Sequence, residues 1–311
     1  MAIEHASVQV VRKPWGVIDL HPWSLIDASG DAVGELLFQR ADKNAPPTAL
    51  LLKLLFTSEP LSIQVHPDDA FAHSIGLPNG KTEAWYILSA KPGAQVAIGL
   101  NQTLAPQELR ESIKDGSIAG LVDWRSATAG DIIVVPAGTI HAIGAGIVLA
   151  EIQQRSDTTF RLFDYGRPRE LHEDSAVAAS CPGPLQAQSG PRRLTPVRTV
   201  LAAIPHFVIE RVDLPANSNW LLNADRETWI LVIEGHAWVG PTSAVAGDAM
   251  FVEGDHAGIE AGADGMSALI AYPGPDPIMP LLQESGEQTT SSAGGSVLRP
   301  PKPKEIVEAQ T

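Results

Sequence analysis

The stretch Leu61–Asp69, LSIQVHPDD, is the part of this sequence that decides the fold. Apolar residues at 61, 63 and 65 alternate with Ser62, Gln64 and His66, and a period of two is typical of a half-buried strand with one aliphatic face. The other face then carries a hydroxyl, a carboxamide and an imidazole, which are costly to bury without a partner. A polar, solvent-facing strand edge would explain an isolated Gln-x-His more simply, so other segments must decide.

Length and composition indicate a globular protein. The chain has 311 residues, of which 44% are hydrophobic, and this is enough for one elaborated domain or two modest ones with a real core. Its 22 lysines and arginines stand against 36 aspartates and glutamates, a net charge of −14. That balance argues against nucleic acid or an anionic membrane as a partner. An anionic substrate would need a locally positive pocket.

The cysteine content limits the kind of metal site, and the distribution of apolar residues limits the location of the protein. Cys181 is the single cysteine, so neither an intramolecular disulfide nor a thiolate metal cluster can form. A metal would have to be held by histidine, carboxylate or amide groups. The N-terminal residues hold no apolar run of signal-peptide length, and no stretch approaches a membrane span. We therefore expect a soluble, cytoplasmic protein.

Short runs of Val, Ile and Leu recur about every ten residues between glycines and prolines, a pattern that favours an all-β sandwich or barrel. Minor helices are expected within 66–76, 103–116 and 169–180. Composition also predicts an organisation in four parts. These are a first β-domain with short helices (1–179), a linker (180–196), a second β-domain (197–283) and a polar tail rich in Pro, Gly and Ser (284–311).

A weak internal repeat supports two related domains. The paired segments are TEAWYIL (82–88) with RETWILV (226–232), and AGDIIVVPAGTIHAI (129–143) with AGDAMFVEGDHAGIE (246–260). The alignment matches Trp85 with Trp229 and places Gly258 where the first copy has His141. Since nothing before Trp229 repeats the Gln-x-His strand, we expect the second copy to hold no metal, with His256 nearby but not a ligand.

Three segments of the first copy supply a consistent set of metal ligands. Lys81 and Glu83 are two residues apart on a predicted strand and so share a face. Pro136 and Gly138 suit a tight turn, and His141 follows at the start of the next strand. Together with Gln64 and His66, these residues offer a mixed nitrogen and oxygen set that suits a borderline divalent ion. Each residue alone has an ordinary structural explanation, but one shared site explains all of them.

A fourth segment carries an arginine inside a predicted strand. Asp157, Thr159 and Arg161 alternate on one face, while Phe160 and Leu162 occupy the other. An arginine in a strand needs an anionic partner or ligand. A structural Arg–Asp pair and a functional role explain this pattern equally well.

The ordered segments PLSIQVHPDD (60–69), GKTEAWYIL (80–88), VPAGTIHAIG (135–144) and EIQQRSDTTFRLFDYGR (151–167) resemble the type I mannose-6-phosphate isomerases of the cupin superfamily. KPWG at 13–16 and LLKLL around Lys53 fit the same family. The resemblance is strong from about residue 13 to 167, weakens through the second copy and disappears in the tail. The chain is too short for the large helical insertion of the longer family members.

The resemblance implies two cupin (jelly-roll) β-barrels, the first of them metal-bearing. It also implies one zinc ion per chain, held by Gln64, His66, Glu83 and His141, a catalytic Arg161, and substrate contacts near Ser62, Lys81 and Glu151. The implied reaction interconverts mannose 6-phosphate and fructose 6-phosphate through a cis-enediol, so a base and a cation are needed.

The base could be Glu151 or Asp157, a choice that the sequence leaves open. Ser62 and Lys81 are the natural donors to the phosphate, and Lys53, Lys81 and Arg161 would form the positive spot that an anionic substrate requires. The expected partner is thus a small sugar phosphate, bound by a monomer or homodimer. Two alternatives remain: a non-haem iron cupin oxygenase, and a non-catalytic cupin that only binds sugar phosphates.

Overall fold

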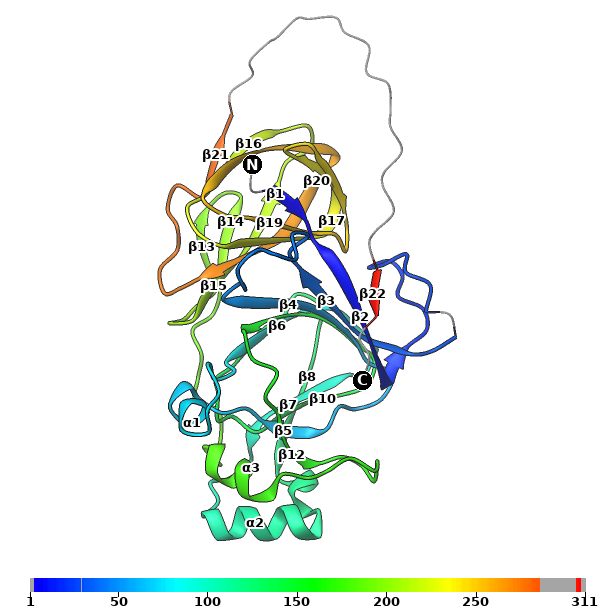
Figure 1. Cartoon of the computed structure of the whole chain (residues 1–311), viewed down its shortest axis with the longest axis vertical. Helices are drawn as coiled ribbons and strands as arrows, with labels where there is room; N and C mark the ends of the chain where they lie inside the picture. The colour runs from blue at the N-terminus through cyan, green and yellow to red at the C-terminus, as the bar shows by residue number, and fades with distance from the viewer. Residues whose placement is uncertain (1–2, 29, 286–305, 309–311) are drawn as a thin grey trace, which may run out of the picture.

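The computed structural model describes residues 3–28, 30–285 and 306–308, and strands make up most of this part of the chain (Figure 1). The expected all-β class with minor helices is confirmed. The helices gather at one end of the molecule and the C-terminal sheet lies at the other. Within the described ranges, no helix has the length and apolar character needed to cross a membrane.

The N-terminal half contains a seven-stranded sheet. Its spatial order is β22 (Ile306–Glu308), β2 (Ser7–Val17), β3 (Val33–Gln39), β4 (Leu50–Phe56), β11 (Ile147–Gln154), β6 (Glu83–Ala90) and β9 (Ile132–Val135). All the pairings are antiparallel except that of β22 with β2. Successive side chains of a strand point to opposite faces. On β4, for example, Lys53 lines a cavity while Leu52 and Leu54 are buried in the core behind the sheet.

A five-stranded sheet faces it, in the order β12 (Phe160–Phe163), β5 (Ile63–Val65), β10 (His141–Ile143), β7 (Gln95–Leu100) and β8 (Val122–Ser126). The strand predicted from the alternation at 61–65 is β5, and the expected face is confirmed: Ile63 and Val65 are fully buried in an apolar cluster. Gln64 lies opposite His141 on β10 and Arg161 on β12. This register brings together segments that are 77 and 97 positions apart in the chain.

The C-terminal half forms a ten-stranded sheet. Its main path is β1 (Ile3–His5), β19 (Ala249–Val252), β17 (Thr228–Val239), β20 (Asp255–Pro273), β15 (Phe207–Leu214), β14 (Arg198–Ala203) and β13 (Arg192–Thr195), with β16 (Asn219–Ala224), β18 (Thr242–Val245) and β21 (Leu282–Glu284) beside it. The first strand of the chain thus pairs with the C-terminal sheet.

One apolar core joins the two halves. The outer face of the seven-stranded sheet contributes Phe38, Leu52 and Leu54, and the C-terminal sheet contributes Trp229 and Phe251. Each of these side chains is at most 2% exposed. Burial on this scale is the main force that holds two sheets together, and it leaves the inner face of the seven-stranded sheet to line a cavity.

The three expected helices are confirmed as α1 (Asp69–Ser74), α2 (Pro106–Asp115) and α3 (Glu173–Ala179), and a 3-10 helix, η1 (Ser117–Gly120), follows α2. At the start of α1, Asp68 accepts a hydrogen bond from the Phe71 amide at 2.7 Å, a common N-cap. α2 begins with proline and ends at Gly116, whose φ of 78° is left-handed. Glycine adopts that conformation without strain.

The internal repeat is visible in the structure. β6 pairs with β9 in the first copy as β17 pairs with β19 in the second. Each AGD turn places its glycine at positive φ, 94° at Gly130 and 88° at Gly247. In both, the aspartate accepts a backbone N–H three residues earlier, Asp131 from Thr128 and Asp248 from Val245. Most of the polar tail predicted over 284–311 lies outside the described residues.

Candidate metal centre

Three buried side chains from three elements converge on one point. His66 follows β5, Glu83 begins β6 and His141 begins β10, and each is 1% exposed. A turn from Pro136 to Thr139, closed by a 3.0 Å backbone hydrogen bond, delivers His141 as expected. In the described part of the chain, these three form the one group of His, Cys, Asp or Glu residues with potential ligand atoms close enough to share an ion.

The separations between the ligand atoms match those around a small ion. Glu83 Oε2 lies 3.4 Å from His66 Nε2, and Glu83 Oε1 lies 3.4 Å from His141 Nε2. Metal–ligand bonds of about 2.0–2.1 Å in a tetrahedron place neighbouring ligand atoms roughly 3.3–3.4 Å apart. These two separations fit ligands that share one divalent metal ion.

Three of these four atoms are left without hydrogen bonds. His66 Nε2 and both oxygens of Glu83 are buried and have no hydrogen-bond partner among the described residues, although Glu83 Oε2 forms an ion pair with Lys81 at 3.0 Å. Meanwhile, the other ring nitrogens are used: His66 Nδ1 donates to the Thr158 carbonyl and His141 Nδ1 to the Thr139 carbonyl, both at 2.8 Å. This leaves the Nε2 lone pairs directed at the centre, as is usual for metal-binding histidines. Buried polar atoms without partners fit a metal.

The electrostatics also prepare these groups for a cation. Burial, and then the charge of Lys81, lower the pKa of His66 to about 3, and burial lowers the pKa of His141. Burial alone would raise the pKa of Glu83, but Lys81 and the two histidines outweigh it and hold that pKa well below its usual range. Neutral histidines and an ionised glutamate are the protonation states that bind metal.

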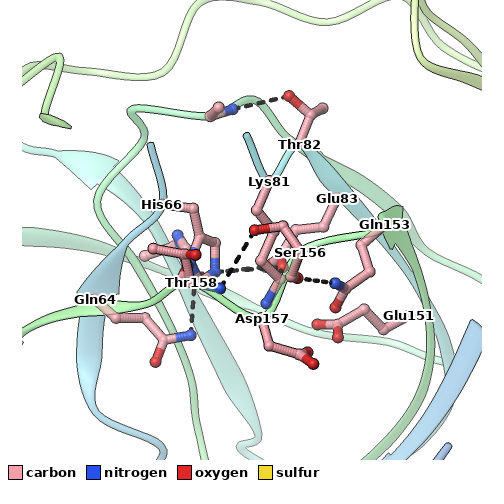
Figure 2. Close-up of polar contacts among 12 residues, drawn as sticks. Gln64, His66, Lys81, Thr82, Glu83, Glu151, Gln153, Ser156, Asp157 and Thr158 are labelled. Atoms are coloured by element: carbon pink, nitrogen blue, oxygen red, sulfur yellow. Dashed lines mark hydrogen bonds and ion pairs between the residues drawn. The ribbon is translucent and has the colours of Figure 1, made fainter. Parts of the chain in front are cut away.

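Gln64 lies beside the triad, in contact with His141, and Figure 2 shows it near His66. Its amide nitrogen lies 3.3 Å from His141 Nε2, and its oxygen accepts a 3.0 Å hydrogen bond from the Ser62 hydroxyl. A half-turn of the amide would exchange the two atoms and direct the oxygen at the centre. The structure thus places all four predicted ligands together, with Gln64 able to complete the set.

The triad adjoins a cavity of about 860 Å³ between the two N-terminal sheets. Gln64 and Lys81 belong to both the cavity wall and the surroundings of the triad. The charged residues of the wall are Lys13, Glu35, Lys53, Lys81, Glu151, Arg155, Asp157, Arg161 and Arg169. Six are cationic and three are acidic. The positive pocket that an anionic ligand needs is therefore present in a protein of net charge −14.

Lys53 is a buried residue of this wall that forms ion pairs with three carboxylates. Its Nζ lies 3.1 Å from Asp157, 3.6 Å from Glu151 and 3.7 Å from Glu35. Burial disfavours the charged amine, but these carboxylates outweigh it and raise the pKa of Lys53. Burial, and then the charge of Glu83, raise the pKa of Glu151 to about 7.

Arg161 lies in the same cavity wall as Asp157 and Thr159, while Phe160 and Leu162 are buried on the other side of the strand. Its Nη1 donates to the Glu170 carbonyl at 2.8 Å. The buried carboxylate nearby, Asp164, instead holds Arg169 through two 2.6 Å hydrogen bonds. Arg161 is thus oriented by a backbone carbonyl.

The sequence patterns did not predict several groups of the site. Glu35 and Arg169 line the cavity, and the carbonyls of Thr139 and Thr158 orient the two histidines. On β3, Glu35 alternates with the buried Leu36, beside the strand that carries Lys53, and this pattern could have indicated the first of these. Backbone carbonyls leave no trace in side-chain patterns.

The second copy uses its equivalent groups differently. Glu227, at the position of Glu83, accepts hydrogen bonds from the Ala49 and Leu50 amides and from Trp229 Nε1. His256 is exposed and bonded to Asn223 at 2.7 Å. Glu227 thus has N–H partners where Glu83 has none among the described residues, and His256 is exposed whereas His141 is buried.

Known proteins with similar sequences include mannose-6-phosphate isomerases. The mannose-6-phosphate isomerase of Streptococcus mutans is 39% identical over 168 residues, which are 51% of this chain and 53% of that protein. The mannose-6-phosphate isomerase ManA of Bacillus subtilis is 43% identical over 136 residues, 41% of this chain and 42% of that protein. The chain thus spans about half the length of the curated relatives it matches. No protein-family model matches the chain.

Solved structures extend the similarity to nearly the whole fold. A crystal structure of the mannose 6-phosphate isomerase from Bacillus subtilis has a TM-score of 0.75 at 25% identity and covers 87% of this chain and 99% of its own. A zinc-bound mannose 6-phosphate isomerase, at 14% identity, shares the fold with a TM-score of 0.70 over 88% of this chain and all of its own. The chain is thus similar to mannose-6-phosphate isomerases over about half of its sequence and over most of its fold.

Proposed function

We propose that this protein is a zinc-dependent isomerase of type I that interconverts mannose 6-phosphate and fructose 6-phosphate. The observation that carries the proposal is the buried triad of His66, Glu83 and His141, in which His66 Nε2 and both Glu83 oxygens lack hydrogen-bond partners among the described residues. This triad adjoins a cavity with a positively charged wall. Two cupin barrels, the division at 179, 196 and 283, and a cytoplasmic monomer or homodimer belong to the same proposal.

The metal would be held by His66, Glu83, His141 and, after rotation of its amide, Gln64. When bound, zinc supplies a positive charge that polarises the sugar oxygens without redox chemistry. The ionised Glu83 and the two neutral histidines offer it one negative charge, so the site keeps a net positive character. That character would stabilise the negative charge that develops on the neighbouring sugar oxygens.

The reaction moves a proton from C2 of the aldose to C1 and another from O2 to O1, through a cis-enediol. Of the two candidate bases, Glu151 is favoured. It is buried in the cavity wall and oriented by Trp85 Nε1 at 3.2 Å. The Asp157 side chain is mostly exposed and lies 3.1 Å from Lys53. Its partial desolvation would raise its pKa, but the charge of Lys53 outweighs that effect and lowers the pKa. A base whose pKa lies near the working pH transfers protons most efficiently.

The remaining wall residues suit a sugar phosphate. Arg161 carries a permanent charge that can stabilise the enediolate without titrating. Ser62 and Lys81 remain the proposed hydrogen-bond donors to the substrate phosphate. Lys81 Nζ also lies 3.0 Å from Glu83. Lys53 and Asp157 would contact the substrate and keep the wall near Glu151 positive.

A coupled assay tests this function. Purified protein should convert mannose 6-phosphate to fructose 6-phosphate, lose the activity to a chelator and regain it with zinc. Retained sugar-phosphate binding without turnover would instead favour a binding protein. Oxygen uptake with Fe(II), in place of isomerisation, would favour an oxygenase.

A further inference from the structure

Gln153 is a buried side chain that the chemistry described above does not use. It lies on β11 directly across from Glu83 on β6 and is completely buried. It does not contribute to the cavity wall, so it has no route to a substrate. A fully buried carboxamide in the middle of a sheet is costly unless its hydrogen bonds have a purpose.

Its amide nitrogen makes two hydrogen bonds, one to the last residue of β11 and one to the turn that follows; Figure 2 shows Gln153 beside Ser156 of that turn. Nε2 donates to the Gln154 carbonyl at 3.0 Å and to the Ser156 carbonyl at 2.5 Å. Its oxygen is buried and has no hydrogen-bond partner in the part of the chain that the structure describes. The donor end is therefore the part of Gln153 that acts on the turn.

That turn reaches the metal centre two residues later. The Thr158 carbonyl accepts the Nδ1–H of His66 at 2.8 Å. This bond keeps the proton on Nδ1 and the lone pair on Nε2, which faces Glu83. A shift of the turn would lengthen the bond and release the ring to rotate or to change tautomer.

We propose that Gln153 is a positioning residue of the metal centre. By holding the Gln154 and Ser156 carbonyls, it sets the turn so that Thr158 fixes the tautomer and orientation of His66. The inference rests on the proposed zinc site, and it adds a residue that touches neither the ion nor the substrate.

Gln153→Met tests the proposal, because methionine keeps most of the volume and cannot donate. The matched control is Gln188→Met, since Gln188 also bonds two backbone groups, the amide and carbonyl of Val134, but is exposed and bonds β9 in place of the turn that leads to Thr158. The readouts are the Zn²⁺ dissociation constant, measured by competition with a chelating indicator, and the tautomer of His66 in the apoprotein from its ring ¹⁵N shifts.

We expect Gln153→Met to weaken Zn²⁺ binding roughly 10–100-fold, the usual cost of losing an outer partner of a metal-binding histidine, and to mix the His66 tautomers. Gln188→Met should bind Zn²⁺ like the wild type. Wild-type Zn²⁺ affinity in Gln153→Met, or an unchanged Nδ1–H tautomer, would overturn the proposal. Failure of the wild-type protein to bind Zn²⁺ would overturn the proposed function itself.

Gln153→Leu covers the case in which Gln153→Met does not fold. Leucine cannot donate to either carbonyl and adds no charge. Weaker Zn²⁺ binding in this variant would therefore support the positioning role, and equal or tighter binding would overturn it. If neither variant folds, Gln153 serves folding alone and the proposal is wrong.

Discussion

Glu83 and Glu227 occupy the same position in the two halves of the internal repeat, but their surroundings differ. Glu227 accepts three N–H groups and thereby fastens the start of β4 to the C-terminal sheet. Glu83 is more deeply buried and has no hydrogen-bond partner among the described residues. One carboxylate has become a structural anchor between the sheets, and the other has been kept available for a ligand.

The same contrast holds for the buried charges of each half. In the C-terminal sheet, Arg198 binds Glu210 through 2.7 and 2.8 Å hydrogen bonds, and Tyr272 donates to the same carboxylate. In the N-terminal half, His66 Nε2 and the Glu83 oxygens are buried without hydrogen-bond partners among the described residues, and Glu83 lies 3.4 Å from the Nε2 atom of each histidine. Burial of paired polar groups serves the fold, whereas burial of unpaired ones indicates a ligand.

The largest expected effect comes from His141→Ala, which removes one ligand of the triad. Zinc binding should weaken at least ~100-fold and turnover should fall roughly 10³-fold or more, because the remaining ligands cannot close the site. Metal analysis of the purified variant and the coupled assay measure both. The control is His256→Ala in the second copy, whose metal content should equal that of the wild type. Full zinc occupancy in His141→Ala would refute the assignment of ligands.

Arg161→Lys should have the next largest effect, because it keeps the charge and loses the planar guanidinium. We expect kcat to fall about 100-fold, while zinc content and KM stay within about twofold, the pattern of a contact made mainly in the transition state. Arg192→Lys on β13, an exposed arginine, is the control. Normal turnover with reduced stability would show that Arg161 has only a structural role.

The sequence predicted the parts of the site that depend on local pattern. The alternation at 61–65 predicted the faces of β5, and Pro106 with Gly116 predicted α2. The register that places His141 opposite Gln64 is a tertiary property and had to come from the structure. The Thr158 carbonyl that orients His66 could not be predicted, because every residue has a carbonyl and only the fold selects one.

Glu227→Leu tests the structural half of the comparison. It leaves the Ala49 and Leu50 amides without their acceptor, and each unsatisfied buried donor costs about 1–3 kcal/mol. We expect the free energy of unfolding in urea to fall by about 2–4 kcal/mol, with zinc affinity unchanged. Glu234→Leu, at an exposed position on the same strand, should change stability by less than about 0.5 kcal/mol. Equal stabilities for the two variants would remove Glu227 as an anchor.

The smallest effect, and the sharpest test of how the triad is held, is the pH dependence of the metal-free protein. Burial lowers the pKa of His66 from 6.5 to about 3, so between these values the unfolded chain binds a proton that the folded protein refuses. Stability due to His66 is therefore complete above pH 6.5 and is lost as the pH falls toward 3, by up to ~1.4 kcal/mol per pH unit. The raised pKa of Glu151 acts in the opposite direction, because its stabilising effect is lost as the pH rises from 4.5 to about 7.

Comparison of the wild type with His66→Gln cancels the contributions of Glu151 and all other groups that the two proteins share. Unfolding in urea, measured with a chelator present between pH 6.5 and 4.5, should give a steeper decline for the wild type than for the variant. Parallel curves would mean that His66 titrates as an ordinary surface histidine, and the site would then not be prepared for a metal by burial.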